Sequence, residues 1–355
     1  MRWQVNDDDA RADDAGGGQG ALFGGYGGQV VERRPGRGSF QGMEFLHVRA
    51  QTIISSLTPP ARLPFRHTIN AYRGCSHACT YCFARPSHEW LELDIGEGFE
   101  RQIVVKVNAI ERLRAELDPR RWAGEPIAMG TNTDPYQHCE GIYRLTAGLV
   151  EVLAAVGNPF SLLTKSTLVL RDLDLLAEAS RRTDVSVNLS IGTLDPEVWR
   201  ATEPGTPHPR QRLEAVARLR DAGVSCGVLV APVLPGLSDG AEQLDEVVAA
   251  CVEAGASAIS GGQVVYLKPG TREVFLGHLA RTHPHLVGRY QDLYQGVYAP
   301  NEVRQEVSRR LNRALDRHRG RRVDIRTHAT SRTRRATVSS PPRPRQAPTQ
   351  LGLPL

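Results

Sequence analysis

Short apolar runs rich in β-branched residues alternate with longer amphipathic stretches over most of the chain. A short apolar run is typical of a buried strand, whereas apolar positions repeated every third or fourth residue are typical of a helix. The predicted strands are RHTINAY, QIVVKV, EPIAMGT, FSLLTKS, VSVNLSIGT, VSCGVLVAPVL and SAISGGQVVYL. Repeated strand–helix units favour an α/β fold with a parallel sheet, either open or closed into a barrel.

Local signals mark where the helices between these strands begin and end. Gly157, Gly223 and Gly255 each follow the last apolar position of a helical stretch, where glycine commonly adopts the left-handed conformation that ends a helix. Asn108, with Glu111 three residues later, predicts a capping box ahead of another helix, AIERLRAEL.

Polar residues gather directly after the predicted strands. NTDPYQHCE follows one strand, TKS (164–166) belongs to the end of the next, and PVLPGLSD follows a later one. Asn188 and Ser190 are two residues apart within a strand and therefore share a face. Polar groups at the carboxyl ends of successive strands are how an α/β barrel builds its active site, so this distribution favours a barrel.

Lysine usage singles out one of these strand ends. The chain has only 3 Lys beside 41 Arg, and one of the three, Lys165, follows an apolar strand. A compact ammonium at that place can bind a carboxylate or a phosphate. A lysine whose stem simply lies along apolar surface would satisfy the same pattern.

The net charge of +5 is concentrated near the C-terminus. From Pro300 onward there are 14 Arg and 4 acidic residues, so the rest of the chain carries 30 basic and 35 acidic residues. Residues 329–355 form an Arg/Pro-rich tail without acidic residues, and residues 1–40 are rich in glycine; both are expected to be disordered. The predicted folded domain is therefore 41–328, with basic C-terminal helices that could approach nucleic-acid phosphates.

The N-terminus is acidic, and no run of eighteen apolar residues occurs, which argues against a signal peptide and a membrane partner. We therefore expect a cytoplasmic protein. Six cysteines in 355 residues are too few for a disulfide framework, so a tight cluster of them more often binds metal or takes part in chemistry. Cys226 and Cys251 lie in apolar contexts and are predicted to be core thiols.

Three of the cysteines, Cys75, Cys79 and Cys82, lie within the segment GCSHACTYCFAR. Structural zinc and iron–sulfur clusters both use closely spaced thiolates, and both usually take four protein ligands. A [4Fe–4S] cluster can instead leave one iron free to bind a small molecule. The residues that could supply a fourth ligand to zinc are His77, His88, His138 and Cys139.

This spacing, with Tyr81 just before the third cysteine, resembles the signature of the radical S-adenosylmethionine superfamily from about residue 43 to about residue 300. NAYRGCSHACTYCFAR, TNTDPYQ, LLTKSTLVLRDLDLL and APVLPGLSD resemble the branch related to spore photoproduct lyase. The resemblance implies a partial (β/α)6 barrel in which the loop after the first strand carries a [4Fe–4S] cluster. It also implies reductive cleavage of S-adenosylmethionine to a 5′-deoxyadenosyl radical that acts on an unidentified substrate, with nucleic acid as one candidate. An electron donor such as a ferredoxin or flavodoxin would serve the cluster.

The resemblance further implies roles for individual side chains. Tyr81 would pack near the adenine of S-adenosylmethionine, and Asn188 would contact its ribose. Lys165 and Ser190 would contact its methionine carboxylate. Thr133 and Asp134 occupy the place of a Gly-Gly-Glu-like segment, which binds the methionine amino group, although TNTD departs from that pattern.

Two positions concern the substrate radical. Spore photoproduct lyases use a cysteine near the end of the second strand to return a hydrogen atom, and the matching position here is Thr131. A hydroxyl is a poor replacement because its O–H bond is much stronger than a thiol S–H bond, so the sequence predicts no efficient repair of spore photoproduct. Cys139 is a candidate hydrogen-atom donor or auxiliary ligand.

Two other functional classes remain open from the sequence. A zinc- and nucleic-acid-binding module would use the cysteines and the basic C-terminus, but it would leave Lys165 and the polar strand ends without a role. An iron–sulfur electron carrier would enclose its cluster with four protein ligands.

Overall fold

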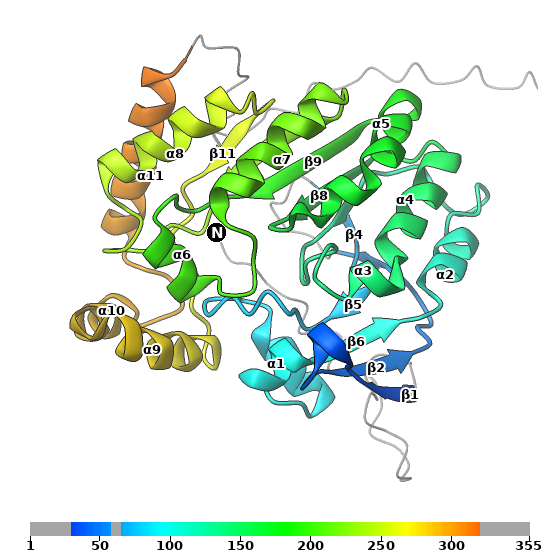
Figure 1. The fold of residues 1–355 in the computed structure, drawn as a ribbon, viewed down its shortest axis with the longest axis horizontal. Coiled ribbons are helices and arrows are strands. Elements are labelled where there is room, and N and C mark those ends of the chain that lie inside the picture. The colour runs from blue at the N-terminus through cyan, green and yellow to red at the C-terminus, as the bar shows by residue number, and fades with distance from the viewer. Residues whose placement is uncertain (1–29, 58–64, 320–355) are drawn as a thin grey trace, which may run out of the picture.

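The computed structural model describes residues 30–57 and 65–319, which build two sheets and a set of surrounding helices (Figure 1). Most of the two terminal segments expected to be disordered lies outside the described residues. One part of that expectation is wrong, because residues 30–35 form a strand.

The larger sheet contains six parallel strands, as a partial (β/α)6 barrel requires. In spatial order its strands are β11 (Ile259–Gly261), β10 (Ser225–Val230), β9 (Val185–Ser190), β8 (Phe160–Thr164), β7 (Ile127–Met129), β4 (His67–Ile69) and β3 (Ile54–Ser56). β3 pairs antiparallel to β4 at one edge. Among the described strands the two edges do not pair, so the sheet is open. Each parallel strand lies within a strand predicted from the sequence.

The remaining predicted strand, QIVVKV, belongs to a separate, smaller sheet. In spatial order this sheet is β1 (Val30–Pro35), β2 (Glu44–Val48), β6 (Gln102–Lys106) and β5 (Tyr72–Arg73). The continuous apolar run in β6 reflects burial of both faces, because Ile103 and Val105 pack into the main core while Val104 joins a second cluster. β1 is ordered because it pairs antiparallel with β2 and Arg33 forms an ion pair with Glu44 at 3.1 Å.

Helices flank the parallel sheet, and Figure 1 shows α8 and α11 together beside β11, with α4 and α5 beyond the opposite part of the sheet. All α-helices of the described residues, whichever sheet they adjoin, are α1 (Glu97–Arg101), α2 (Ala109–Glu116), α3 (Glu140–Tyr143), α4 (Leu145–Ala155), α5 (Leu173–Arg182), α6 (Pro196–Thr202), α7 (Pro209–Asp221), α8 (Ala241–Glu253), α9 (Thr271–Thr282), α10 (Val287–Leu293) and α11 (Asn301–Arg317). Gly157, Gly223 and Gly255 have positive φ, which confirms the predicted helix ends. None of the helices in the described ranges combines the length and apolar character needed to cross a membrane.

The prediction of a capping box at Asn108 is wrong. The Asn108 side chain makes no cap hydrogen bond to α2. Its Oδ1 instead accepts from the Ala50 backbone N–H at 2.8 Å, and its Nδ2 donates to the Ala50 carbonyl at 2.9 Å. Asn108 therefore ties α2 to the chain that follows β2, a distant partner that a local sequence pattern does not reveal.

We expect Asn108→Ala to lower the free energy of unfolding by about 1–3 kcal/mol, the scale for leaving buried backbone groups unpaired. Glu111→Ala should change it by less than about 0.5 kcal/mol, because Glu111 is exposed and its side chain, among the described residues, forms a surface ion pair with Arg49. Urea denaturation of the parent and both variants measures this difference. If Glu111→Ala lowered the free energy of unfolding as much as Asn108→Ala, the result would instead support the predicted capping box.

Candidate active site at the carboxyl ends of the parallel strands

The loop that carries the three cysteines lies between β5 and the 3₁₀ segment Arg85–Leu91. Gly74 introduces it with φ +78°, and a Cβ there would lie 2.9 Å from the Phe99 carbonyl oxygen. Arg85 is fully buried, and two of its nitrogens donate to the Cys79 carbonyl at 3.0 and 3.2 Å. These contacts fix the backbone around Cys79.

The three thiols interact with one another, and two of them are shielded from solvent while Cys82 is partly exposed. Cys75 and Cys79 are buried, and Cys75 interacts electrostatically with both Cys79 and Cys82. Burial raises the pKa of all three thiols, while Lys165 acts in the opposite direction on Cys79 and Cys82. Their thiolate forms therefore need nearby cations, and the irons of a cluster would supply them. Three soft sulfur donors in one short loop fit an iron–sulfur cluster.

The arrangement of this loop gives less support to a zinc site than to an iron–sulfur cluster. Within residues 30–57 and 65–319 no group of three or more His, Cys, Asp or Glu side chains is arranged to hold a metal ion. A single tetrahedral ion draws its thiolates closer together than a four-iron cluster does. Of the candidate fourth ligands, Cys139 is buried in the core, whereas His77 and His88 each use one ring nitrogen, toward Asp134 and the Gln102 carbonyl, and leave the other without a hydrogen-bond partner.

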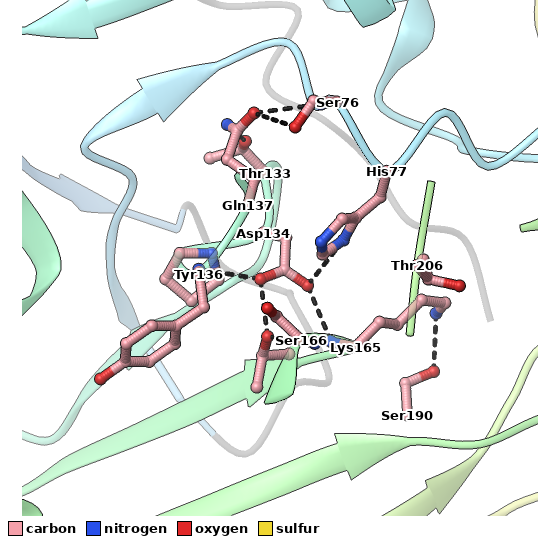
Figure 2. A network of polar contacts seen from close by, with 12 residues as sticks. Ser76, His77, Thr133, Asp134, Tyr136, Gln137, Lys165, Ser166, Ser190 and Thr206 are labelled. Carbon is pink, nitrogen blue, oxygen red and sulfur yellow. Dashed lines mark hydrogen bonds and ion pairs between the residues drawn. The ribbon is translucent and has the colours of Figure 1, made fainter. Parts of the chain in front are cut away.

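Asp134 connects the cysteine loop to two neighbouring strand ends (Figure 2). Its Oδ1 accepts from the Tyr136 N–H at 2.9 Å and from the Thr164 hydroxyl at 2.6 Å. Its Oδ2 accepts from the Lys165 N–H at 2.7 Å and lies 3.3 Å from His77 Nδ1. Burial alone would raise the pKa of Asp134, but His77 and the hydrogen bonds lower it to about 2. Its acceptor positions are engaged by the protein, which favours a positioning role over direct contact with a ligand.

The segment before and after Asp134 also binds the cysteine loop. The Thr133 hydroxyl donates to the Gly74 carbonyl at 2.7 Å, and Gln137 Nε2 donates to the same carbonyl at 3.0 Å. Gln137 Oε1 accepts from the Ser76 N–H at 3.0 Å. The sequence interpretation did not include Gln137, although it lies in the quoted string TNTDPYQ.

Lys165, Ser190 and Tyr81 come together, the first two as expected from the strand ends and Tyr81 as the resemblance implies. Lys165 Nζ donates to the Ser190 hydroxyl at 2.7 Å and lies 5.9 Å from the centroid of the Tyr81 ring. The same ammonium is 3.8 Å from Glu203 Oε1, and the Tyr81 hydroxyl donates to that carboxylate. Glu203 is thus a member of the site that sequence reasoning missed.

Glu203 is held by Arg212, which was also missed. Arg212 is fully buried, and its Nη2 lies 2.5 Å from Glu203 Oε2 while its Nη1 donates to the Ser190 carbonyl at 2.9 Å. One signal was present: Arg212 shares the buried face of α7 with Val216 and Leu219, and an arginine in an apolar stripe needs a buried partner. Burial would raise the pKa of Glu203, but Arg212 and Lys165 lower it to about 2.

The turn that carries Glu203 closes over the cysteine loop. The Thr80 N–H donates to the Thr202 carbonyl at 3.0 Å, and the Gly205 N–H donates to the His77 carbonyl at 3.1 Å. A Cβ at Gly205 would collide with the Ser76 carbonyl oxygen. The loop is therefore fixed from two sides, by the segment around Asp134 and by this turn.

The remaining candidate site residues, Asn188, Thr131 and Cys139, lie on three different segments of the chain. Asn188, on β9, has its Oδ1 only 2.6 Å from where a Cβ at Gly227 would lie, so the glycine in β10 leaves room for the amide. The Thr131 hydroxyl accepts from Asn70 Nδ2 at 3.3 Å. Cys139 is buried in the hydrophobic core beside α3, which favours packing over a role as hydrogen-atom donor. The predicted core thiols are confirmed, because both are buried: Cys226 and Cys251.

We expect the pKa of Glu203 to make the stability of the protein depend on pH. The pKa is about 2 in the folded protein against 4.5 for the free side chain, so the carboxylate contributes stability above about pH 4.5 that is lost as the pH falls toward 2. Glu203→Gln should be less stable near neutral pH and should lose less stability over this interval than the parent. Urea denaturation at a series of pH values tests this, with the exposed Glu246→Gln as control. Parallel curves for parent and Glu203→Gln would contradict it.

Comparisons with known proteins agree with this geometry. A family model described as the radical SAM superfamily matches residues 69–249. An uncharacterized protein of Mycobacterium tuberculosis strain H37Rv is 46% identical over 281 residues, which cover 79% of this chain and 82% of the relative. The radical SAM Nalpha-GlyT isomerase of Pseudomonas phage M6 is 26% identical over 163 residues, which cover 46% of this chain and 32% of that protein.

Among solved structures, spore photoproduct lyase complexed with dinucleoside spore photoproduct has a TM-score of 0.59 at 19% identity. The alignment covers 80% of this chain and 82% of that one, and at this identity it shows a common fold. The match of the family model, together with the three-cysteine loop and the six-stranded parallel sheet, establishes that the chain belongs to the radical SAM superfamily and is an enzyme.

Proposed function

We propose that this enzyme binds a [4Fe–4S] cluster through Cys75, Cys79 and Cys82 and reductively cleaves S-adenosylmethionine. The radical produced would act on a nucleic-acid component. When bound, the cluster and S-adenosylmethionine supply one electron and a cleavable sulfonium, and their reaction leaves a 5′-deoxyadenosyl radical. A one-electron donor protein such as a ferredoxin or flavodoxin would deliver the electron.

The charge balance beside the cysteine loop carries the proposal. Lys165 and Arg212 are two cations around the single carboxylate of Glu203. Arg212 neutralises Glu203 at close range, whereas the Lys165 ammonium is 3.8 Å from it. The Lys165 ammonium has the neutral Ser190 hydroxyl at hydrogen-bond distance and the Glu203 carboxylate only at 3.8 Å, so it can take an incoming carboxylate as a close partner. The methionine carboxylate of S-adenosylmethionine is such a group, and Lys165 with Ser190 would hold it.

The other proposed contacts follow from the same arrangement. The Tyr81 ring lies beside the Lys165 ammonium, where it can pack against adenine, and Asn188 on the neighbouring part of β9 can hydrogen-bond a ribose hydroxyl. For Thr133 and Asp134 we propose an indirect role. They fix the cysteine loop and the backbone of Lys165, and through these they position the methionine amino group.

The proposed substrate class rests on two relatives and on one residue. The solved neighbour holds a dinucleoside spore photoproduct, and the phage relative is called a Nalpha-GlyT isomerase. Thr131 provides a hydroxyl where a thiol would be needed, and Cys139 is buried in the core. We therefore propose a reaction on a nucleic-acid component that differs from spore photoproduct repair.

Anaerobically reconstituted protein is expected to hold about four irons per chain and, once reduced, to release 5′-deoxyadenosine from S-adenosylmethionine. Cys79→Ala should abolish both, because it removes one of three cluster ligands. Cys226→Ala is the matched control, since its thiol lies in the core and both readouts should persist. Iron analysis and chromatography of the products measure the outcome. One zinc and no iron per chain would contradict the proposal, and rapid conversion of a synthetic spore photoproduct dinucleotide to two thymidines would contradict its substrate part.

A further inference from the structure

His77 has a buried ring nitrogen that the proposed function does not yet use. The residue lies in the cysteine loop between Cys75 and Cys79 and is only 1% exposed. Figure 2 shows its ring turned toward Asp134, and Nδ1 lies 3.3 Å from Asp134 Oδ2. Nε2, in contrast, has no hydrogen-bond partner among the described residues. A buried polar atom without a partner is costly, so this nitrogen points to a group that binds beside the loop.

Asp134 determines which kind of group Nε2 can bind. Its carboxylate faces Nδ1 and accepts from the N–H there, so the neutral imidazole carries its lone pair on Nε2. A carboxylate that accepts from one ring nitrogen makes the other a stronger acceptor. The ionised carboxylate also favours positive charge on the group that donates. Nε2 therefore suits an amino group better than a carbonyl or a phosphate.

The two carboxylates beside the cysteine loop are less suited to such a donor. Each oxygen of Asp134 already has two contacts with the protein. The oxygens of Glu203 are engaged by Arg212 and by the Tyr81 hydroxyl. Of these three acidic or imidazole side chains, His77 is the one with an acceptor atom that no hydrogen bond within residues 30–57 and 65–319 uses.

We propose that His77 Nε2 accepts a hydrogen bond from the methionine amino group of S-adenosylmethionine. This inference rests on the proposed function, in which Lys165 holds the carboxylate of the same methionine. Asp134 Oδ2 links the two residues, because it faces His77 Nδ1 at 3.3 Å and accepts from the Lys165 N–H at 2.7 Å. One carboxylate oxygen thus sets the position of the residue for the amino group relative to the residue for the carboxylate.

The inference also defines the indirect role of Asp134. Asp134 supplies the negative charge and orients the ring, whereas His77 makes the contact with the amino group. A direct contact from Asp134 would require it to give up one of its contacts with Thr164, Tyr136, Lys165 or His77. Binding through His77 leaves all of them in place, so the cysteine loop stays joined to the end of β8 when the cofactor binds.

Anaerobic calorimetric titration of the reconstituted, oxidised protein tests the inference, because cleavage of S-adenosylmethionine needs an electron that the oxidised protein lacks. Two ligands are compared: S-adenosylmethionine and the analogue in which hydrogen replaces the amino group. His77→Asn keeps an amide N–H that can donate to Asp134 but removes Nε2. It should therefore weaken S-adenosylmethionine binding roughly tenfold, the scale for one hydrogen bond, and change binding of the analogue by less than about twofold.

Three further variants separate this contact from a structural role. His77→Gln places an amide oxygen near the position of Nε2 and should recover most of the affinity for S-adenosylmethionine. Lys165→Ala should weaken both ligands by similar factors, because both carry the carboxylate. His138→Gln is the matched control: His138 is exposed, its ring packs edge-on against His77 with centroids 5.7 Å apart, and both affinities should stay unchanged.

Equal weakening of the two ligands by His77→Asn would mean that His77 only supports the loop, and it would overturn the inference. Unchanged affinity for S-adenosylmethionine in this variant would do the same. If the parent binds the analogue too weakly to measure, the two His77 variants decide, and equal affinities for S-adenosylmethionine would count against the inference. A parent protein that holds its cluster but binds no S-adenosylmethionine would remove the proposed function as well, so the two failures are distinguishable.

Discussion

One buried carboxylate, Asp134, is the contact on which the site's arrangement depends. It joins the cysteine loop through His77 to the end of β8 through Thr164 and Lys165. An ionised carboxylate removed from water is costly unless its oxygens are paired. The three segments therefore stay together as long as Asp134 stays charged, and the position of the Lys165 side chain relative to the cysteines follows from this contact.

A second buried pair completes the arrangement from the opposite side. Glu203 and Arg212 anchor the turn that lies against the cysteine loop, and Glu203 also binds the Tyr81 hydroxyl. Removing one member of such a pair leaves an unpaired buried charge, which is far more destabilising than the pair itself is stabilising. The pair is thus better understood as fixing geometry than as adding net stability. Because Arg212 binds Glu203 at close range, the more distant Lys165 ammonium can pair with a further carboxylate.

The sequence predicted the parts of this site that depend on local pattern. Strand positions followed from β-branched runs, and Lys165 and Ser190 were expected together because the carboxyl ends of parallel strands share one edge. Tyr81 was placed near them only by the family resemblance. Gln137 and Glu203 were missed because they bind the cysteine loop, 61 and 122 residues away along the chain. Arg212 is only nine residues from Glu203 and was missed although its place in the apolar stripe of α7 was a usable signal.

The same limit explains the two errors in the fold. Asn108 satisfies a local capping pattern, yet it binds Ala50, 58 residues earlier. Residues 30–35 follow a glycine-rich stretch and have little apolar character of their own, so only pairing with β2 orders them. β6 is a strand as predicted, but which sheet it joins depends on partners that its own sequence does not specify.

The central claim is that Lys165 is the cation that binds the carboxylate of S-adenosylmethionine beside the cysteine loop. The most direct measurement is a titration of the reduced, reconstituted protein with S-adenosylmethionine, followed by electron paramagnetic resonance of the cluster. We expect the cofactor to perturb the cluster signal of the parent. Lys165→Ala should retain the cluster but bind about 2 kcal/mol more weakly, roughly 30-fold, the scale for one charge-assisted hydrogen bond. Lys165→Arg, which keeps the charge, should recover part of the affinity, whereas equal affinities for parent and Lys165→Ala would contradict the account.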